Sequence, residues 1–319
     1  MPSETESIII GLILTIGAII VVIAYIPCLI VIYRDKELLV QSCYMMMFVL
    51  GCVELIACSL HLYVGIGTIT GLFYHLPLKW NKLSGALMEF FGWHYYTVSS
   101  TALAFNRCLH MCAPNVGKVL FSRKATVCWI IGCFLYAGLW FILLTSPYGE
   151  FTYNPDIFTW EFSGEYNQTV KHIDYAQNLV NFTPTCICYA IILGAVVYKR
   201  MKYTADASET MSSREKRLFI LLAISGLYPV VYDQYWHYLN DLLYTKLGLR
   251  KDFAFAWAEF MWITVTGLNP FLYLTLNQTI REKVWSLQFL SCVKNRVTPH
   301  ISIRRSTKNT HEVSDRPEV

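Results

Sequence analysis

Long apolar stretches dominate the chain, and each is close to the length that crosses a lipid bilayer. Stretches without Lys or Arg, and with at most one acidic residue, cover positions 8–33, 38–64, 83–106, 125–146, 176–198, 218–240 and 253–276. A helix needs about 20 mostly apolar residues to cross a hydrocarbon core of about 30 Å. We therefore predict an all-α integral membrane protein, a bundle of seven transmembrane helices.

Basic residues are distributed unevenly between the loops on the two sides of this bundle. Twenty of the 26 Lys and Arg residues fall in the tail and in the loops on its side, and six fall on the other side. The positive-inside rule then places the N-terminus outside and the tail in the cytoplasm. The first apolar stretch is too long for the core of a cleaved signal and follows Glu4 and Glu6, so we expect it to be retained.

Three segments of unequal length follow from this topology. Residues 1–7 form an extracellular N-terminus, residues 8–293 the membrane domain with a juxtamembrane amphipathic helix near 279–290, and residues 294–319 a disordered cytoplasmic tail. The longest outer loop contains the sequon Asn167-Gln168-Thr169, which makes Asn167 a candidate for glycosylation. Cys292 follows the amphipathic stretch and is a candidate for palmitoylation.

Four acidic residues lie inside the apolar stretches, where a charge is costly and usually marks a functional pocket or a hydrogen-bonded group. They are Glu54, Glu89, Asp233 and Glu259. No Lys or Arg is available at that depth to pair with them. Each acid is therefore neutral, binds a small cation, faces water, or receives a positively charged ligand.

The third and sixth predicted helices place several of these groups on defined faces. Glu89 and Arg107 are 18 residues apart, which is five turns of a regular α-helix and puts them on one face at opposite ends. Asp233 and His237 are four residues apart and share a face, so we expect a hydrogen-bonded pair that lines the outer vestibule. A zinc site needs more ligands than this pair, and no others are suitably spaced, so we predict neither a metal nor a cofactor.

Aromatic residues surround the acids of the sixth and seventh helices. Such residues often form an interfacial belt, but some are expected to face inward and line a pocket for a small organic ligand. The predicted ligand-binding residues are Glu89, His94, Asp233, Trp236, His237, Trp257 and Glu259.

Prolines and one asparagine interrupt the later helices. Glu54 and Asn269 lie at comparable depth, so we expect a polar contact between the second and seventh helices. Pro229 and Pro270 remove backbone donors and are expected to bend the sixth and seventh helices. The third helix ends on the triplet Asn106-Arg107-Cys108.

Seven helices, this triplet, and the Asn-Pro-x-x-Tyr motif formed by Asn269, Pro270 and Tyr273 resemble a G-protein-coupled receptor. The stretches "YIPCLIVIYRDKELLVQSCYMMMFVLGCVELIA" and "LAFNRCLHMCAPNVGKVLFSRKATVCWI" look more narrowly like the nematode serpentine chemoreceptors, class T in particular. The resemblance implies a plasma-membrane receptor of sensory neurons or their cilia, which detects a small environmental molecule and activates a heterotrimeric G protein.

The resemblance also implies roles for individual residues. Those implied to act in activation and G-protein coupling are Glu54, Asn106, Arg107, Pro229, Asn269, Pro270 and Tyr273. Glu89 falls where amine receptors of this kind hold their ligand-binding aspartate. The chain departs from the family in having Asn106 before the arginine, Leu227 where a tryptophan is usual, and no cysteine in an outer loop. The usual bridge between the third helix and the second outer loop therefore cannot form.

Two other classes of protein could also use buried acids. An ion channel or transporter would use them as a cation path, but the odd helix number and the lack of an internal repeat argue against it. An intramembrane metal-dependent hydrolase could use Asp233 and His237, but no further metal ligand or nucleophile is suitably spaced. We therefore predict a receptor and not an enzyme. Its expected partners are a small-molecule ligand, a heterotrimeric G protein and membrane lipid, with no role for nucleic acid.

Overall fold

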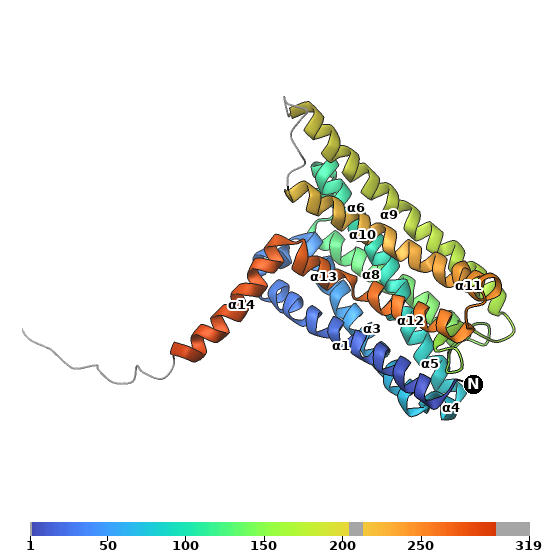
Figure 1. Cartoon of the computed structure of the whole chain (residues 1–319). Helices are drawn as coiled ribbons and strands as arrows, with labels where there is room; N and C mark the ends of the chain where they lie inside the picture. The colour runs from blue at the N-terminus through green and yellow to red at the C-terminus, as the bar shows by residue number, and fades with distance from the viewer. Residues whose placement is uncertain (1, 204–212, 298–319) are drawn as a thin grey trace, which may run out of the picture.

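The computed structural model describes residues 2–203 and 213–297, which form seven long helical rods packed side by side (Figure 1). The first four rods are α1 (Glu4–Arg34), α3 (Ser42–Thr70), the run of α5 (Leu78–Met88), η1 (Glu89–His94) and α6 (Tyr95–Cys112), and α8 (Arg123–Thr145). The other three are α9 (Asn167–Tyr203), the run of α10 (Ser213–Gln234), η2 (Tyr235–Leu239) and α11 (Asn240–Leu247), and α12 (Lys251–Thr266) followed by α13 (Leu268–Thr275). Short helices α2 (Lys36–Val40), α4 (Leu72–His75) and α7 (Pro114–Leu120) lie between rods.

The N-terminus and α14 mark opposite ends of the bundle. The chain begins near α4 and α5, whereas α14 (Gln278–Val297) leaves the bundle at its far end (Figure 1). We call these the hairpin end, after the β-hairpin described below, and the α14 end. The amphipathic helix predicted near 279–290 is therefore present and extends further, to Val297.

The seven rods coincide with the seven predicted apolar stretches, but not all of them are continuous helices. Among the described residues, α1, α3, α8 and the described part of α9 are each long and apolar enough to cross a membrane unbroken. The third and sixth rods instead contain the π-helical turns η1 and η2, and the seventh is interrupted at Gly267. Because a π turn inserts an extra residue, the single face predicted for Glu89 and Arg107 from regular α-helical spacing is wrong.

The interruption of the seventh rod lies directly before the Asn-Pro pair. Asn269 donates from Nδ2 to Oε1 of Glu54 at 2.8 Å, and the hydroxyl of Tyr25 donates to the other carboxylate oxygen. The predicted contact between the second and seventh helices is therefore present. Glu54 is fully buried with both oxygens paired, as an interior carboxyl group requires.

A β-hairpin covers the bundle at the end where the chain begins. Strands β1 (Phe151–Asn154) and β2 (Thr159–Phe162) pair antiparallel, with Phe151 opposite Phe162. We call residues 151–162 the hairpin lid. Its aromatic side chains, including those of Tyr153 and Trp160, are almost fully buried. The alternation of large apolar residues buries one face of the lid. A loop, not a hairpin, was expected here from the sequence.

Candidate ligand-binding site

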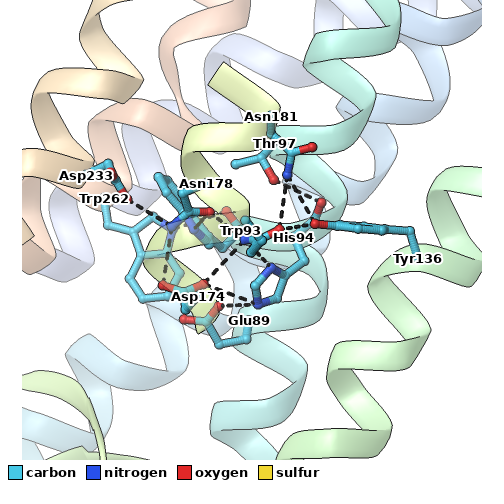
Figure 2. Close-up of polar contacts among 12 residues, drawn as sticks. Glu89, Trp93, His94, Thr97, Tyr136, Asp174, Asn178, Asn181, Asp233 and Trp262 are labelled. Carbon is cyan, nitrogen blue, oxygen red and sulfur yellow. Dashed lines mark hydrogen bonds and ion pairs between the residues drawn. The ribbon is translucent and has the colours of Figure 1, made fainter. Parts of the chain in front are cut away.

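Five ionisable side chains meet near the hairpin end, inside the bundle. This polar cluster consists of Glu89, His94, Asp174, Asp233 and His237, each at most 6% exposed. Figure 2 shows Glu89, His94 and Asp174 pointing toward one another, with Asp233 on the far side of Asp174 and Asn178. Three rods supply these side chains, so the cluster exists only in the folded bundle.

Asp174 connects the two histidines of the cluster. His94 Nε2 lies 3.0 Å from Glu89 Oε2 and 3.9 Å from Asp174 Oδ1. His237 Nε2 lies 3.3 Å from Asp174 Oδ2 and 3.5 Å from Asp233 Oδ1. Each imidazole therefore lies between two carboxylates, and the Asp174 carboxylate is common to both.

A stripe of amides on α9 supports the cluster from one side. Asn178 donates from Nδ2 to Asp233 at 2.9 Å and to Asp174 at 3.2 Å, and accepts from Trp93 Nε1 at 3.1 Å. Gln177 Nε2 lies 3.2 Å from Nδ1 of His94 and donates to it. The carboxylate and imidazole orientations are thus held by neighbours that are themselves hydrogen-bonded.

A second layer fixes Gln177 in turn. Its Oε1 accepts from Nδ2 of Asn181 at 3.1 Å and from the hydroxyl of Tyr136. The His94 ring stacks on Trp140, with ring centroids 4.1 Å apart. His94 is therefore fixed on its face by an aromatic ring and at its edge by an amide.

Local helix geometry explains why these residues converge. Asp174 and Asn178 are four apart on α9, and Asp233 and His237 are four apart across α10 and η2, so each pair shares a helix face. Glu89 and His94 are five apart, a spacing that turns side chains about 140° away from each other in an α-helix. They meet because η1 is a π turn, in which the backbone hydrogen bonds join residues five apart and so bring them to the same side.

Aromatic rings enclose the cluster. The cavity among these groups has a volume of about 10 Å³, with Trp93, Tyr232, Trp236 and Trp262 in its wall. Trp262 is held in place by a hydrogen bond from Nε1 to the carbonyl of Gly92 at 3.1 Å. The ring of Phe162 in the hairpin lid meets Trp236 edge-on at 5.7 Å, so the lid closes this end of the cavity.

The structure brings together most of the predicted ligand-binding residues. Four of them, Glu89, His94, Asp233 and His237, belong to the cluster, and Trp236 lines its cavity. Glu259 lies apart, fully buried, with Oε1 3.0 Å from Nδ1 of His61. Trp257 is 54% exposed and is not among the residues that line the cavity.

Asp174 is the main residue that sequence reasoning missed. The fifth apolar stretch was taken to begin at residue 176, which left Asp174 in a loop, whereas α9 begins at Asn167. Its spacing from Asn178 and from Gln177 was the available signal, because residues three and four apart share a helix face. The approach of His237 to Asp233 was expected from their spacing, and the two lie 3.5 Å apart. The approach of the other histidines to Glu89, Asp174 and Glu259 was not expected.

The α14 end of the bundle carries a second, larger cavity. It has a volume of about 790 Å³ and includes Asn106 and Arg107 in its lining. Asn106 donates from Nδ2 to Ser42 Oγ at 2.9 Å, which ties the end of α6 to the start of α3. Arg107 Nη2 lies 3.8 Å from Sδ of Met47, and among the described side chains no carboxylate forms an ion pair with it.

The remaining predicted positions are distributed over the rest of the bundle. Pro229 lies inside α10, and Pro270 and Tyr273 lie buried in α13. Asn167 is the partly exposed first residue of α9. Cys292 lies on α14 with its side chain outside the described part of the structure, and the tail from residue 298 onward is not described either.

Sequence comparison decides the family. The profile of the serpentine type 7TM GPCR chemoreceptor Srt matches residues 1–297. The chain belongs to this family. The resemblance noted from the sequence is therefore confirmed, and the receptor is a multi-pass membrane protein, not an enzyme, that takes a ligand and a G protein as partners. Among the curated proteins none matches the receptor.

The fold is also that of a rhodopsin-like receptor. The crystal structure of squid rhodopsin matches with a TM-score of 0.73 and 15% sequence identity, over 95% of this chain and 94% of that one. At this identity the likeness shows the arrangement of the helices alone. Neither comparison supports a channel, a transporter or a hydrolase.

Proposed function

We propose that this chemosensory receptor detects a small organic cation at the polar cluster. The observation that supports the proposal is the excess of buried acids: three carboxylates, from Glu89, Asp174 and Asp233, face two imidazoles. With both histidines protonated and all three acids ionised, the cluster still carries one uncompensated negative charge. A cationic ligand supplies the positive charge that compensates it, and so offsets the cost of burying the carboxylates.

An organic ligand needs more room than the closed cluster offers. A cavity of about 10 Å³ holds no more than one water molecule. The hairpin lid and Trp236 are the elements that separate the cluster from the hairpin end. We therefore infer that the ligand enters when the lid or this ring moves, and that the closed arrangement belongs to the unliganded receptor.

The signal is proposed to pass along the second, third and seventh rods to the α14 end. Trp93, in the cavity wall, contacts Trp262 edge-on at 6.3 Å, and Trp262 in turn contacts His61 at 5.7 Å. Below these rings, Glu54 and Asn269 join the second rod to the seventh at the Gly267 interruption. A rod already broken at that point can change its bend at low cost, and a ligand that prefers one bend shifts the population.

The cavity around Arg107 is the proposed G-protein site. Its position at the α14 end agrees with the basic loops that the positive-inside rule places in the cytoplasm. In this orientation Asn167 is extracellular and accessible to glycosylation, and Cys292 lies at the cytoplasmic membrane surface and is accessible to palmitoylation. We propose the plasma membrane of sensory neurons as the location, as in the class T chemoreceptors that the sequence resembles.

A cell-based reporter of G-protein activation tests the cation site. Primary and quaternary amines are compared with neutral molecules of the same shape, and only the amines are expected to activate. Glu89→Gln and Asp174→Asn should each reduce potency by roughly 10-fold or more, since hydrogen bonds to charged groups contribute about 1.5–3 kcal/mol. Glu165→Gln is the control, because it removes an acid from an exposed loop position. Equal responses to amines and neutral isosteres would contradict the proposal.

A further inference from the structure

We propose that Glu89, His94 and Asp174 form a binding site for a transition-metal ion of the zinc type. The three residues offer one imidazole nitrogen and two carboxylate oxygens whose ligand atoms all lie within 4.8 Å of one another. Sequence spacing offered no further ligand near Asp233 and His237. In the folded bundle α9 supplies one, Asp174, beside Glu89 and His94.

The spacing of the ligand atoms suits a small tetrahedral ion. Zinc bonds of about 2.0–2.1 Å place neighbouring ligand atoms roughly 3.3 Å apart. His94 Nε2 lies 3.0 Å from Glu89 Oε2 and 3.9 Å from Asp174 Oδ1, on either side of that value. For the two pairs that include His94, side-chain adjustments of roughly half an ångström therefore bring the atoms to that separation.

Two of the ligand atoms have no hydrogen-bond partner. Glu89 Oε2 and His94 Nε2 are both buried, and although they lie 3.0 Å apart, neither makes a hydrogen bond of acceptable geometry. A buried polar atom without a partner costs about 1–3 kcal/mol. A metal ion between them would satisfy both atoms at once, in the direction in which both already point (Figure 2).

The donor set favours zinc over the hard cations. Imidazole and carboxylate ligands together are typical of zinc sites, whereas calcium and magnesium prefer oxygen ligands alone. The cavity lined by Glu89 and Asp174 has a volume of about 10 Å³, which is room for a single water molecule. A site with three protein ligands and a water in the fourth position is therefore the expected arrangement.

Gln177 decides whether His94 can serve as a ligand. Its Nε2 donates to His94 Nδ1, so in the neutral ring the proton lies on Nε2. Metal binding needs the opposite tautomer, in which Nδ1–H donates to an oxygen of Gln177 after its amide has turned over. Replacement by glutamate would supply that acceptor permanently, as carboxylate partners of zinc-bound histidines do.

Zinc titration of the purified full-length receptor in lipid nanodiscs, after chelator treatment, tests the site. A chromophoric competitor measures affinity, and one zinc ion per receptor is expected. Glu89→Gln and His94→Gln should weaken binding by more than the roughly 10–100-fold that loss of an outer partner costs. Gln177→Glu should tighten it by about 10-fold or more. Absence of binding, or an affinity that Glu89→Gln and His94→Gln leave unchanged, would overturn the proposal.

His61→Gln is the matched control. His61 is equally buried and lies 3.0 Å from a glutamate, Glu259, but it is outside the cluster, so zinc affinity should not change. X-ray absorption of zinc on the unmodified receptor tests the site even if the variants fail to fold. A shell of nitrogen and oxygen with imidazole scattering is expected. Sulfur at about 2.3 Å would assign the metal to the cysteines and overturn the proposal.

The zinc site does not depend on the proposed amine ligand. The titration uses receptor without agonist or G protein, so its outcome stands apart from the reporter assay. If both proposals are correct, zinc and an organic cation compete for Glu89 and Asp174. If Gln177→Glu tightens zinc binding while amines and neutral isosteres activate the receptor equally, the metal site is supported and the amine ligand is contradicted.

Discussion

Asn81 on α5 and Tyr153 in the hairpin lid exchange two hydrogen bonds. Asn81 Nδ2 donates to the Tyr153 carbonyl at 3.0 Å, and the Tyr153 backbone N–H donates to Asn81 Oδ1 at 2.9 Å. The amide thus pairs with the strand as a neighbouring strand would. The Tyr153 hydroxyl also lies 2.8 Å from Oγ1 of Thr68, which attaches the lid to a second rod.

These contacts hold the lid without a disulfide. The ten described cysteines are all free, and the sequence places none of the chain's eleven in an outer loop. Gly85 allows the close approach, since a Cβ there would collide with the carbonyl of Phe151. A lid held by hydrogen bonds and aromatic burial can open reversibly, which the proposed ligand access requires.

Asn81→Ala should loosen the lid. The substitution leaves the buried N–H and carbonyl of Tyr153 without partners, at a cost of about 1–3 kcal/mol. Backbone hydrogen exchange of residues 151–162 is expected to accelerate roughly 5- to 100-fold, because exchange follows local opening. Ser84→Ala is the control, since its hydroxyl donates to its own helix. Unchanged exchange in Asn81→Ala would show that aromatic packing alone holds the lid.

Asn269→Ala should destabilise the bundle through Glu54. Loss of the amide removes the donor to Oε1 in a fully buried site, at a cost of about 1–3 kcal/mol or more for an ionised group. Thermal unfolding in detergent is the measurement. Adding Glu54→Gln should recover part of the loss, because a neutral amide is less costly to bury. Equal stability of Asn269→Ala and the unsubstituted receptor would contradict the role assigned to this contact.

The ion pair between Asp35 and Lys283 should attach α14 in a pH-dependent way. The hydrogen bond from Lys283 lowers the pKa of Asp35 below its usual 3.8. The pair is therefore fully present above that value and is lost as the pH falls through the lowered pKa. Spin-label distances between α2 and α14 should lengthen in strong acid. They should also lengthen in high salt, because the pair is partly exposed.

Lys283→Ala provides the comparison for that titration. In this variant the distance between α2 and α14 should already be long, and it should not change with acid across the same pH range. A distance that responds to acid equally in Lys283→Ala would assign the change to another group.

Arg107→Ala should abolish G-protein activation while leaving ligand binding largely intact. The guanidinium lines the cavity at the α14 end and has no described carboxylate partner, so its removal leaves no buried acid unpaired. Agonist-stimulated nucleotide exchange and ligand binding are measured on the same preparation. Arg123→Ala, at the exposed start of α8, is the control. Undiminished activation would count heavily against the proposed coupling site.

The helices of the candidate site could be predicted, but its contacts could not. Glu89, His94, Asp233 and His237 were recognised because a titratable side chain in an apolar stretch is conspicuous. The pairing of Glu89 with His94 depends on the π turn η1, which no hydrophobic period indicates. Asp174 was missed because a helix that starts at the polar Asn167 carries no apolar signal in its first turns.

The sequence by itself determined the seven crossings and the family of this receptor. Lipid requires each backbone group to be satisfied within its own helix, so every crossing is encoded locally by about 20 consecutive residues. Only the tertiary structure decided which acid meets which histidine, where the rods break, and that a hairpin covers the cluster. These features join residues as far apart as Asn81 and Tyr153 or His61 and Glu259, and such contacts are determined by packing between rods, not by the composition of any one of them.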